Sequence, residues 1–245
     1  MPKFFFPLEA MEGSRIHISG ETAHHLLHVL RMKPGDEVVL CDGLGTDYHG
    51  ALAETTPTVI FDIRETSTCD TEPSVNITLF QSLPKGDKMD FIIQKCVELG
   101  VSSIQPVHTE RCVARIKDKD APKKIARFQK IAESAAGQSM RGIIPVVHPP
   151  LSFKAAIDSI SNATTKQDSL TLVAYEKEHF LALKSAVVNN PININLWIGS
   201  EGGFSDNEIT ALCNIGATPI TLGRRILRTE TAAIATIAQI ICLCE

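Results

Sequence analysis

Two glycine-bearing segments in the last fifth of the chain carry residue types suited to holding a ligand. The first is Gly199-Ser-Glu-Gly-Gly-Phe204, which joins an apolar run to a predicted helix. Its glycines allow unusual backbone dihedrals and a close approach to a ligand. A turn of this kind is also common as a purely structural feature. It lacks G-x-G-x-x-G spacing, and the chain has no G-x-x-x-x-G-K-[ST] loop, which disfavours dinucleotide and ATP sites.

The second segment is Leu222-Gly-Arg-Arg-Ile-Leu-Arg-Thr-Glu-Thr-Ala232, which precedes a helix rich in alanine and isoleucine. Arg224, Arg225 and Arg228 form either a solvated surface cluster or the cationic side of a site. Open α/β sheets bind ligands at the carboxyl ends of their strands. Two such loops after two strands therefore favour a ligand crevice.

The elements that would position these loops are read from hydrophobic periodicity. From Val75 onward short apolar runs alternate with amphipathic stretches, which predicts a parallel sheet with crossover helices. The predicted strands are 76–83, 101–107, 143–147, 170–175, 192–198 and 218–222. The predicted helices are 87–99, 122–136, 152–160, 179–188, 205–214 and 229–243. Ser205 with Glu208 predicts a capping box at the start of the helix that follows the first loop.

The first 70 residues have a different pattern. Short β segments at 15–19, 37–41 and 59–63, with one helix at 24–32, indicate a small β-barrel. Polar, turn-prone residues replace the hydrophobic pattern at 65–73. We therefore expect an N-terminal domain over 1–70 and an α/β domain over 74–245.

The charge distribution points to a local basic surface rather than a basic protein. The 245 residues carry a net charge of −4, but the window 110–141 holds 9 Lys and Arg against 4 Asp and Glu. A polyanion would meet this patch. No apolar run is long enough for a membrane span, and we expect a cytoplasmic protein.

Metal binding is not expected. The seven cysteines contain no CxxC pair, and His24, His25 and His28 have no acidic or cysteine partner at ligand spacing.

Taken together, the motifs resemble the RsmE family of the SPOUT superfamily, 16S ribosomal RNA small-subunit methyltransferases that act on uridine N3. The resemblance is carried by I-G-S-E-G-G-F-S-x-x-E-I and L-G-x-R-I-L-R-T-E-T-A. It extends to the segments His24–Asp36, Lys85–Val101 and Gly137–Arg141. It implies a PUA-like barrel, an α/β domain with a deep trefoil knot, S-adenosylmethionine as methyl donor, the small ribosomal subunit as partner, and a homodimer.

The resemblance also assigns site residues. Those enclosing the donor would be Gly199, Ser200, Glu201, Gly202, Leu222, Gly223, Ile226, Leu227 and Ala232. The family usually has proline where this chain has Ser200. It usually reads A-E-Q-S-G-R where this chain has Gly137 and Met140, which leaves any role of the missing glutamate open.

Uridine N3 must lose a proton before it attacks a methyl group, so a base or a stabilising cation is needed. Arg141 and Arg228 are candidates for the cation. Glu201 is either the proton acceptor or a brace for its loop. The candidates for RNA contact are Arg31, Lys85, Lys88, Arg111 and Arg115, because such side chains bind phosphate. The alternatives are a non-catalytic RNA-binding or ribosome-assembly protein and a knotted ribose 2′-O-methyltransferase.

Overall fold

The computed structural model describes residues 3–161 and 169–245, which form two compact units. The first unit comprises Met1–Glu72 and Ala136–Ile144, and the second comprises Pro73–Ala135 and Pro145–Glu245. The domains predicted at 1–70 and 74–245 are each one continuous stretch of the chain, whereas each observed unit combines two stretches. The short segment Ala136–Ile144 instead packs with the first unit, which the linear order of the chain does not reveal.

The first unit is built on a six-stranded sheet with the order β1-β4-β5-β6-β3-β2. Its strands are β1 (Lys3–Phe5), β2 (Met11–Glu12), β3 (Arg15–Ile18), β4 (Glu37–Cys41), β5 (Thr46–Glu54) and β6 (Val59–Thr68). Only the β1–β4 pair is parallel, and the other pairs are antiparallel. Apolar side chains from most of these strands form one buried cluster, including Ile16, Leu40 and Phe61. Burial of that cluster holds the unit together.

Three strands of this unit agree with the prediction, whereas β1, β2 and β5 were missed. The predicted helix at 24–32 begins and ends earlier. It is α1 (Gly20–His24), followed by one π-helical turn at His25–Val29, and a 3₁₀ turn, Leu8–Ala10, precedes β2. The helix cannot continue to Met32 because Arg31 has a φ of 56°, which lies outside the right-handed region.

The second unit contains a seven-stranded parallel sheet, ordered β10-β8-β7-β12-β11-β13 with β9 paired to β8. The strands are β7 (Asn76–Ser82), β8 (Ser103–His108), β9 (Val146–Val147), β10 (Leu151–Ser152), β11 (Ser169–Ala174), β12 (Asn193–Ile198) and β13 (Thr218–Ile220). Its central strands mix apolar residues with polar ones, and most of their apolar side chains, such as Ile77, Leu79 and Leu196, are buried. The prediction of a parallel sheet is confirmed.

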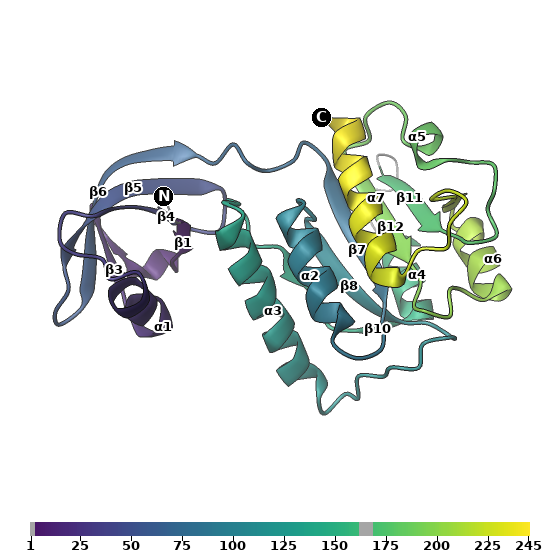
Figure 1. Ribbon diagram of the computed structural model, residues 1–245, viewed down its shortest axis with the longest axis horizontal. Helices are drawn as coiled ribbons and strands as arrows, with labels where there is room; N and C mark the ends of the chain where they lie inside the picture. Colours follow the sequence, from purple (N-terminus) through teal and green to yellow (C-terminus); the bar gives the residue numbers. More distant parts are fainter. Residues whose placement is uncertain (1–2, 162–168) are drawn as a thin grey trace. The chain divides into compact units, whose positions relative to one another are not determined.

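Helices cover the two faces of this sheet (Figure 1). They are α2 (Lys88–Glu98), α3 (Ala121–Gln138), α4 (Phe153–Ser161), α5 (Leu183–Ala186), α6 (Asp206–Asn214) and α7 (Thr229–Cys244). Helices α2 and α7 contact each other, and α7 also contacts β7 and β12. On the other face, α4 and α6 pack over Trp197, which stacks on Phe80 with 4.6 Å between the ring centroids.

One predicted helix is mostly wrong. The stretch 179–188 contains only the short α5, because Ala182 forms a bridge with Thr221, and the Thr221 N–H donates to the Leu181 carbonyl. These contacts fix Leu181 and Ala182 in extended backbone beside the end of β13. The strand β10 was also missed. The trefoil knot implied by the family resemblance stays a prediction. Among the described residues, no helix is long and apolar enough to cross a membrane.

Candidate functional site

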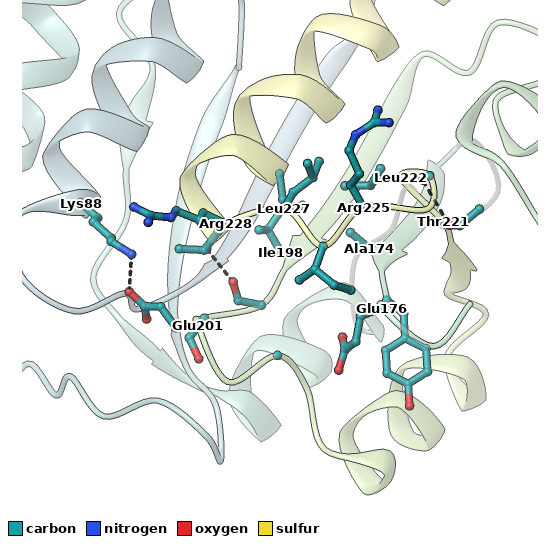
Figure 2. A pocket seen from close by; sticks show the side chains of 18 residues that line it. Lys88, Ala174, Glu176, Ile198, Glu201, Thr221, Leu222, Arg225, Leu227 and Arg228 are labelled. Atoms are coloured by element: carbon teal, nitrogen blue, oxygen red, sulfur yellow. Dashed lines mark hydrogen bonds and ion pairs between the residues drawn. The ribbon is translucent and has the colours of Figure 1, made fainter. Parts of the chain in front are cut away.

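A cavity of about 340 Å³ lies where β11, β12 and β13 end and α7 begins (Figure 2). Three segments, the first turn of α7 and Lys88 of α2 form its walls. The lining residues are Lys88, Ala174, Tyr175, Glu176, Ile198, Gly199, Ser200, Glu201, Gly203, Thr221, Leu222, Gly223, Arg225, Ile226, Leu227, Arg228, Thr229 and Ala232. The position is the one expected for a ligand site on a parallel sheet.

The structure brings both glycine-bearing loops to this cavity. All the residues predicted to enclose the donor line it, except Gly202. The Gly202 carbonyl instead accepts a hydrogen bond from Arg111 Nη1 at 3.1 Å, and Arg111 does not line the cavity. A side chain at Gly202 would meet Arg111 Cβ at 2.9 Å, so this glycine allows Arg111 to pack against the loop. Gly203, which was not among the predicted residues, lines the cavity instead.

The first loop is held in a tight, defined shape. The Gly203 N–H donates to the Ser200 carbonyl at 2.9 Å, and Gly203 has a φ of 65°. After it, the Ser205 hydroxyl accepts from the Glu208 N–H while the Glu208 carboxylate accepts from the Ser205 N–H. The predicted capping box is therefore confirmed. It fixes the start of α6 and, with it, the exit of the loop.

Thr229 ties the two loops together from the start of α7. Its hydroxyl donates to the Gly199 carbonyl at 2.6 Å and accepts from Gln81 Nε2 at 3.0 Å. Both Thr229 and Gln81 are buried. One side chain therefore links the end of β12, the end of β7 and the first turn of α7, and this network maintains the cavity walls.

Replacing Thr229 with valine should weaken this junction. The change keeps the side-chain volume but removes the hydrogen-bond partner of the Gly199 carbonyl and one of the two acceptors of the Gln81 amide, which keeps its bond to the Ser82 carbonyl. We expect a cost of about 1–3 kcal/mol in unfolding free energy. Ligand affinity should fall as well, because the loop loses its anchor. Chemical denaturation and calorimetry would measure the two effects. Thr236→Val is the matched control, because within the described residues the buried Thr236 hydroxyl bonds only the Ala232 carbonyl of its own helix. An unchanged Thr229→Val protein would contradict this account.

Glu201 is engaged by cationic and backbone donors. Its carboxylate lies 2.9 Å from Lys88 Nζ (Figure 2). It also accepts from the Lys85 N–H at 3.2 Å. Lys88 is also ion-paired with Glu230 at 3.4 Å. Burial opposes ionisation of Glu201, but the hydrogen bond from Lys88, backbone N–H donors and the Lys88 charge outweigh it and lower its pKa. A carboxylate with a lowered pKa is a weaker base, so this bonding suits the bracing role better than proton transfer.

The three arginines of the second loop differ in position. Arg225 and Arg228 line the cavity, and Arg224 does not. In Figure 2 Arg225 extends away from Glu201, whereas Arg228 extends from the start of α7 toward the side where Lys88 and Glu201 lie. The solvated-surface interpretation thus fits Arg224, and Arg228 is the arginine directed along the cavity.

Arg141 belongs to the first unit, where it is 3% exposed. Its Nη2 lies 2.6 Å from Glu72 Oε2, and Glu72 Oε1 accepts from the N–H groups of Gly142 and Ile143 at 2.9 and 3.1 Å. Glu72 therefore organises the segment that carries Arg141. The catalytic role of Arg141 stays a prediction, and sequence reasoning did not identify Glu72 as its partner.

The residues predicted to contact RNA lie in both units. Arg31 is exposed in the first unit, just after the π-helical turn. In the second unit Lys85, Arg111 and Arg115 are exposed. Lys88 differs from them because its ammonium is shared by Glu201 and Glu230. Within residues 3–161 and 169–245 no group of three or more His, Cys, Asp or Glu is placed to hold a metal ion.

Sequence reasoning also missed the third wall of the cavity, Ala174-Tyr-Glu176. A usable signal was present, because these residues stand at the end of the strand predicted at 170–175, and strand ends of such sheets meet at one edge. Glu176 is exposed, and its carboxylate lies so close to Gly203 that an added Cβ there would be 2.9 Å from Oε1. It therefore forms part of the cavity wall.

Comparison with known proteins assigns both parts of the chain. Residues 71–241 match the family model described as an RNA methyltransferase domain, and residues 18–63 match the RNA methyltransferase PUA domain. Ribosomal RNA small subunit methyltransferase E of Bacillus subtilis is 32% identical, over 98% of this chain and 96% of the relative. The protein of that name from Synechocystis is 34% identical, over 91% of this chain and 71% of the relative.

Solved structures give the same result. A ribosomal RNA small subunit methyltransferase E from Neisseria gonorrhoeae, bound to S-adenosyl methionine, has a TM-score of 0.87 and 35% identity, with 99% of this chain and 98% of that one covered. A methyltransferase from Legionella pneumophila with the cofactor bound has a TM-score of 0.86 and 30% identity, covering 98% and 96%. The family expected from the motifs is confirmed: the chain belongs to the ribosomal RNA small subunit methyltransferase E family.

Proposed function

We propose that this protein transfers a methyl group from S-adenosylmethionine to N3 of a uridine in 16S ribosomal RNA of the small subunit. The observation that carries the proposal is the cavity at the ends of β11, β12 and β13, formed by both motif loops, in a chain whose solved relatives include methyltransferases with this donor bound. The first alternative, a non-catalytic RNA-binding or ribosome-assembly protein, would bind RNA without transferring a methyl group. The second, a knotted ribose 2′-O-methyltransferase, would transfer it to a ribose oxygen.

The lining of the cavity fits such a donor. Ile198, Leu227 and Ala232 supply apolar surface for a purine ring, and the glycine-bearing loops present backbone amides and carbonyls that can read its edges. Glu176 adds negative charge, which suits a ligand that carries a sulfonium and an ammonium group. S-adenosylmethionine supplies an electrophilic methyl group. The protein's main contribution is to hold that group and the nucleophile in line, which can provide much of the rate enhancement.

Arg228 is our candidate for stabilising the uridine ring as N3 loses its proton. Within the described part of the chain its guanidinium makes no hydrogen bond or ion pair with a side chain, unlike Lys88, whose charge is balanced by two carboxylates. A cation that is not already compensated stabilises developing negative charge most effectively. We propose that Glu201 acts as the brace that keeps Lys88 and the loop in place.

Replacing Arg228 with methionine should lower the rate of methyl transfer by about a hundredfold while changing donor affinity little, because the lost interaction forms mainly in the transition state. Single-turnover kinetics with saturating donor would give the rate, and calorimetry the affinity. Arg224→Met is the matched control, since Arg224 lies on the same loop outside the cavity lining. Equal effects of the two substitutions would remove the assignment.

Arg31, Lys85, Arg111 and Arg115 are proposed to contact RNA phosphates, with Lys88 contributing from the cavity wall. Homodimer formation and a cytoplasmic location are proposed on the family resemblance.

The decisive experiment supplies purified protein, labelled donor and small subunits from cells that lack the gene. Nuclease digestion followed by mass spectrometry would locate the methyl group. A methyl group on uridine N3 supports the proposal. A methyl group on a ribose 2′ oxygen would establish the ribose alternative, and donor-independent RNA binding without methyl transfer would establish the non-catalytic one.

A further inference from the structure

A second cavity, of about 350 Å³, lies at the opposite end of the parallel sheet from the donor cavity. We call it the amino-end pocket, because the first residues of β7, β8, β11 and β12 all line it. None of its described lining residues is lysine, arginine, aspartate or glutamate, so the pocket carries no fixed charge. Its polar lining residues on the strands include Asn76, Thr78, Ser103, Gln105, Asn193 and Asn195.

The pairing register of the sheet gathers these polar side chains on one face. Residues two positions apart on a strand point to the same face. Helix α4 packs over the apolar part of that face, around Phe80 and Trp197. The part nearer the amino ends carries amides and hydroxyls, although the faces of a parallel sheet are usually apolar and covered. The aligned cross-strand neighbours there are Asn76 with Asn193, Thr78 with Asn195, and Thr78 with Ser103.

Gln105 supplies the pocket with an unused acceptor. The residue is 7% exposed, and its Nε2 donates to the carbonyls of Pro106 at 3.0 Å and Pro149 at 2.7 Å. These two bonds fix the orientation of the amide. Its Oε1 has no partner among the described residues, and it is not sealed from the surroundings as Ser82 Oγ and Trp197 Nε1 are. Because Gln105 lines the pocket and is otherwise buried, this oxygen is available to an occupant of the pocket.

The asparagines supply a donor and a further acceptor. Asn76 Nδ2 donates to Asn193 Oδ1 at 3.3 Å, and Asn195 Nδ2 donates to Thr171 Oγ1 at 3.3 Å. Within the described residues, these bonds leave the Asn193 Nδ2 donor and the Asn195 Oδ1 acceptor unused. His148 also lines the pocket, and burial lowers its pKa. Its ring is therefore neutral at neutral pH and offers one donor and one acceptor.

We propose that the amino-end pocket binds a nucleobase, which belongs either to an unpaired nucleotide of the RNA or to a free nucleoside. A base has donors and acceptors on its edges and no charge, which matches a pocket with both kinds of group and no ionic side chain. Asparagine and glutamine amides are among the side chains that pair with such edges. Ile160 and Ile194 add apolar surface for the ring. This inference rests on the proposed function, because it takes RNA as the partner of the protein.

The chain offers a matched pair of variants, Asn195→Leu and Thr171→Val. Each removes the hydrogen bond between Asn195 and Thr171, but only Asn195 lines the pocket. Asn195→Leu should raise the dissociation constant of the preferred nucleoside about fivefold, because a ligand hydrogen bond is lost. Thr171→Val should leave that constant close to the wild-type value. Asn193→Leu tests the donor on the same strand and should give a loss similar to that of Asn195→Leu.

The full-length protein would be titrated with adenosine, guanosine, cytidine and uridine by ligand-observed NMR. Saturating S-adenosylhomocysteine would be present throughout, so that nucleosides do not enter the donor cavity. Nucleoside binding should be the same at about 50 and 200 mM salt, because neither the base nor the pocket is charged. Displacement by a single-stranded pentanucleotide of the same base would assign the site to a nucleotide of RNA. Binding of the nucleoside without such displacement would assign it to free nucleosides.

Three results would overturn the inference. They are the absence of nucleoside binding in the millimolar range, equal losses in Asn195→Leu and Thr171→Val, and a steep loss of nucleoside binding with salt. Donor affinity and methyl transfer would be measured on the same preparations. A protein that methylates RNA but binds no nucleoside would overturn this inference alone. Nucleoside binding without methyl transfer would overturn the proposed function and leave the base site in place.

Discussion

Replacing Gly203 with alanine is expected to reduce donor affinity by about tenfold or more. Gly203 has a φ of 65°, and the left-handed conformation costs an L-residue about 1–2 kcal/mol. The added Cβ would also lie 2.9 and 3.0 Å from the two Glu176 carboxylate oxygens. The variant can relieve both penalties by moving its loop and Glu176 out of the cavity wall. Donor binding must then return the loop to its original position. If that return costs about 1.4 kcal/mol, the donor affinity falls tenfold.

Gly216→Ala separates this local effect from general destabilisation. Gly216 has a φ of 90°, and it lies outside the cavity lining. Apart from its chain neighbours, no described residue has an atom within 4 Å of the Cβ that would be added. The control should lose a similar amount of stability and keep wild-type donor affinity. Combining Gly203→Ala with Glu176→Ala should restore part of the affinity if the carboxylate clash contributes. Equal affinities in the two single variants would show that the shape of the Gly203 loop does not control binding.

Local signals in the sequence predicted most of the second unit correctly. The apolar runs fixed the central strands, and Ser205 with Glu208 identified the start of α6, because capping is decided within a few residues. The error at 179–188 has a non-local cause. A stretch with a helical pattern is held extended by Thr221, which lies about forty positions later in the chain. Helix propensity depends only on neighbouring residues, so it does not reveal a contact with such a distant one.

In the candidate site, too, features set by neighbouring residues could be predicted, and features that depend on distant contacts could not. The glycine-bearing loops could be recognised because their composition is unusual, and nearly all of the predicted lining residues do line the cavity. Thr229 and Glu176 were missed because their importance depends on what they approach in space, namely the Gly199 carbonyl and Gly203. The same limit applies to Arg141, whose partner Glu72 is far away in sequence, in the segment predicted as the linker between the domains.

Replacing Arg141 with alanine should lower methyl transfer about a hundredfold or more while leaving donor affinity unchanged. The donor cavity is lined entirely by residues of the second unit, whereas Arg141 and Glu72 both belong to the first. Loss of the guanidinium also leaves the Glu72 carboxylate without its closest charged partner, at a cost on the order of 3 kcal/mol in unfolding free energy. Calorimetry would test the affinity, and a thermal melt would show the temperature range in which the variant is folded.

Two more conservative substitutions separate a catalytic role of Arg141 from a structural one. Arg141→Lys keeps the positive charge but cannot reproduce the two-point contact of a guanidinium with Glu72. Glu72→Gln keeps Arg141 and weakens the same ion pair from the other side. If Arg141 stabilises the reacting uridine, Arg141→Lys should lose far more methyl transfer than Glu72→Gln at temperatures where both proteins are folded. If the ion pair only shapes the segment, activity and melting temperature should fall in parallel in both variants. An equal loss of donor affinity and methyl transfer in Arg141→Ala would exclude the catalytic assignment, because a residue acting on the uridine alone has no effect on donor binding.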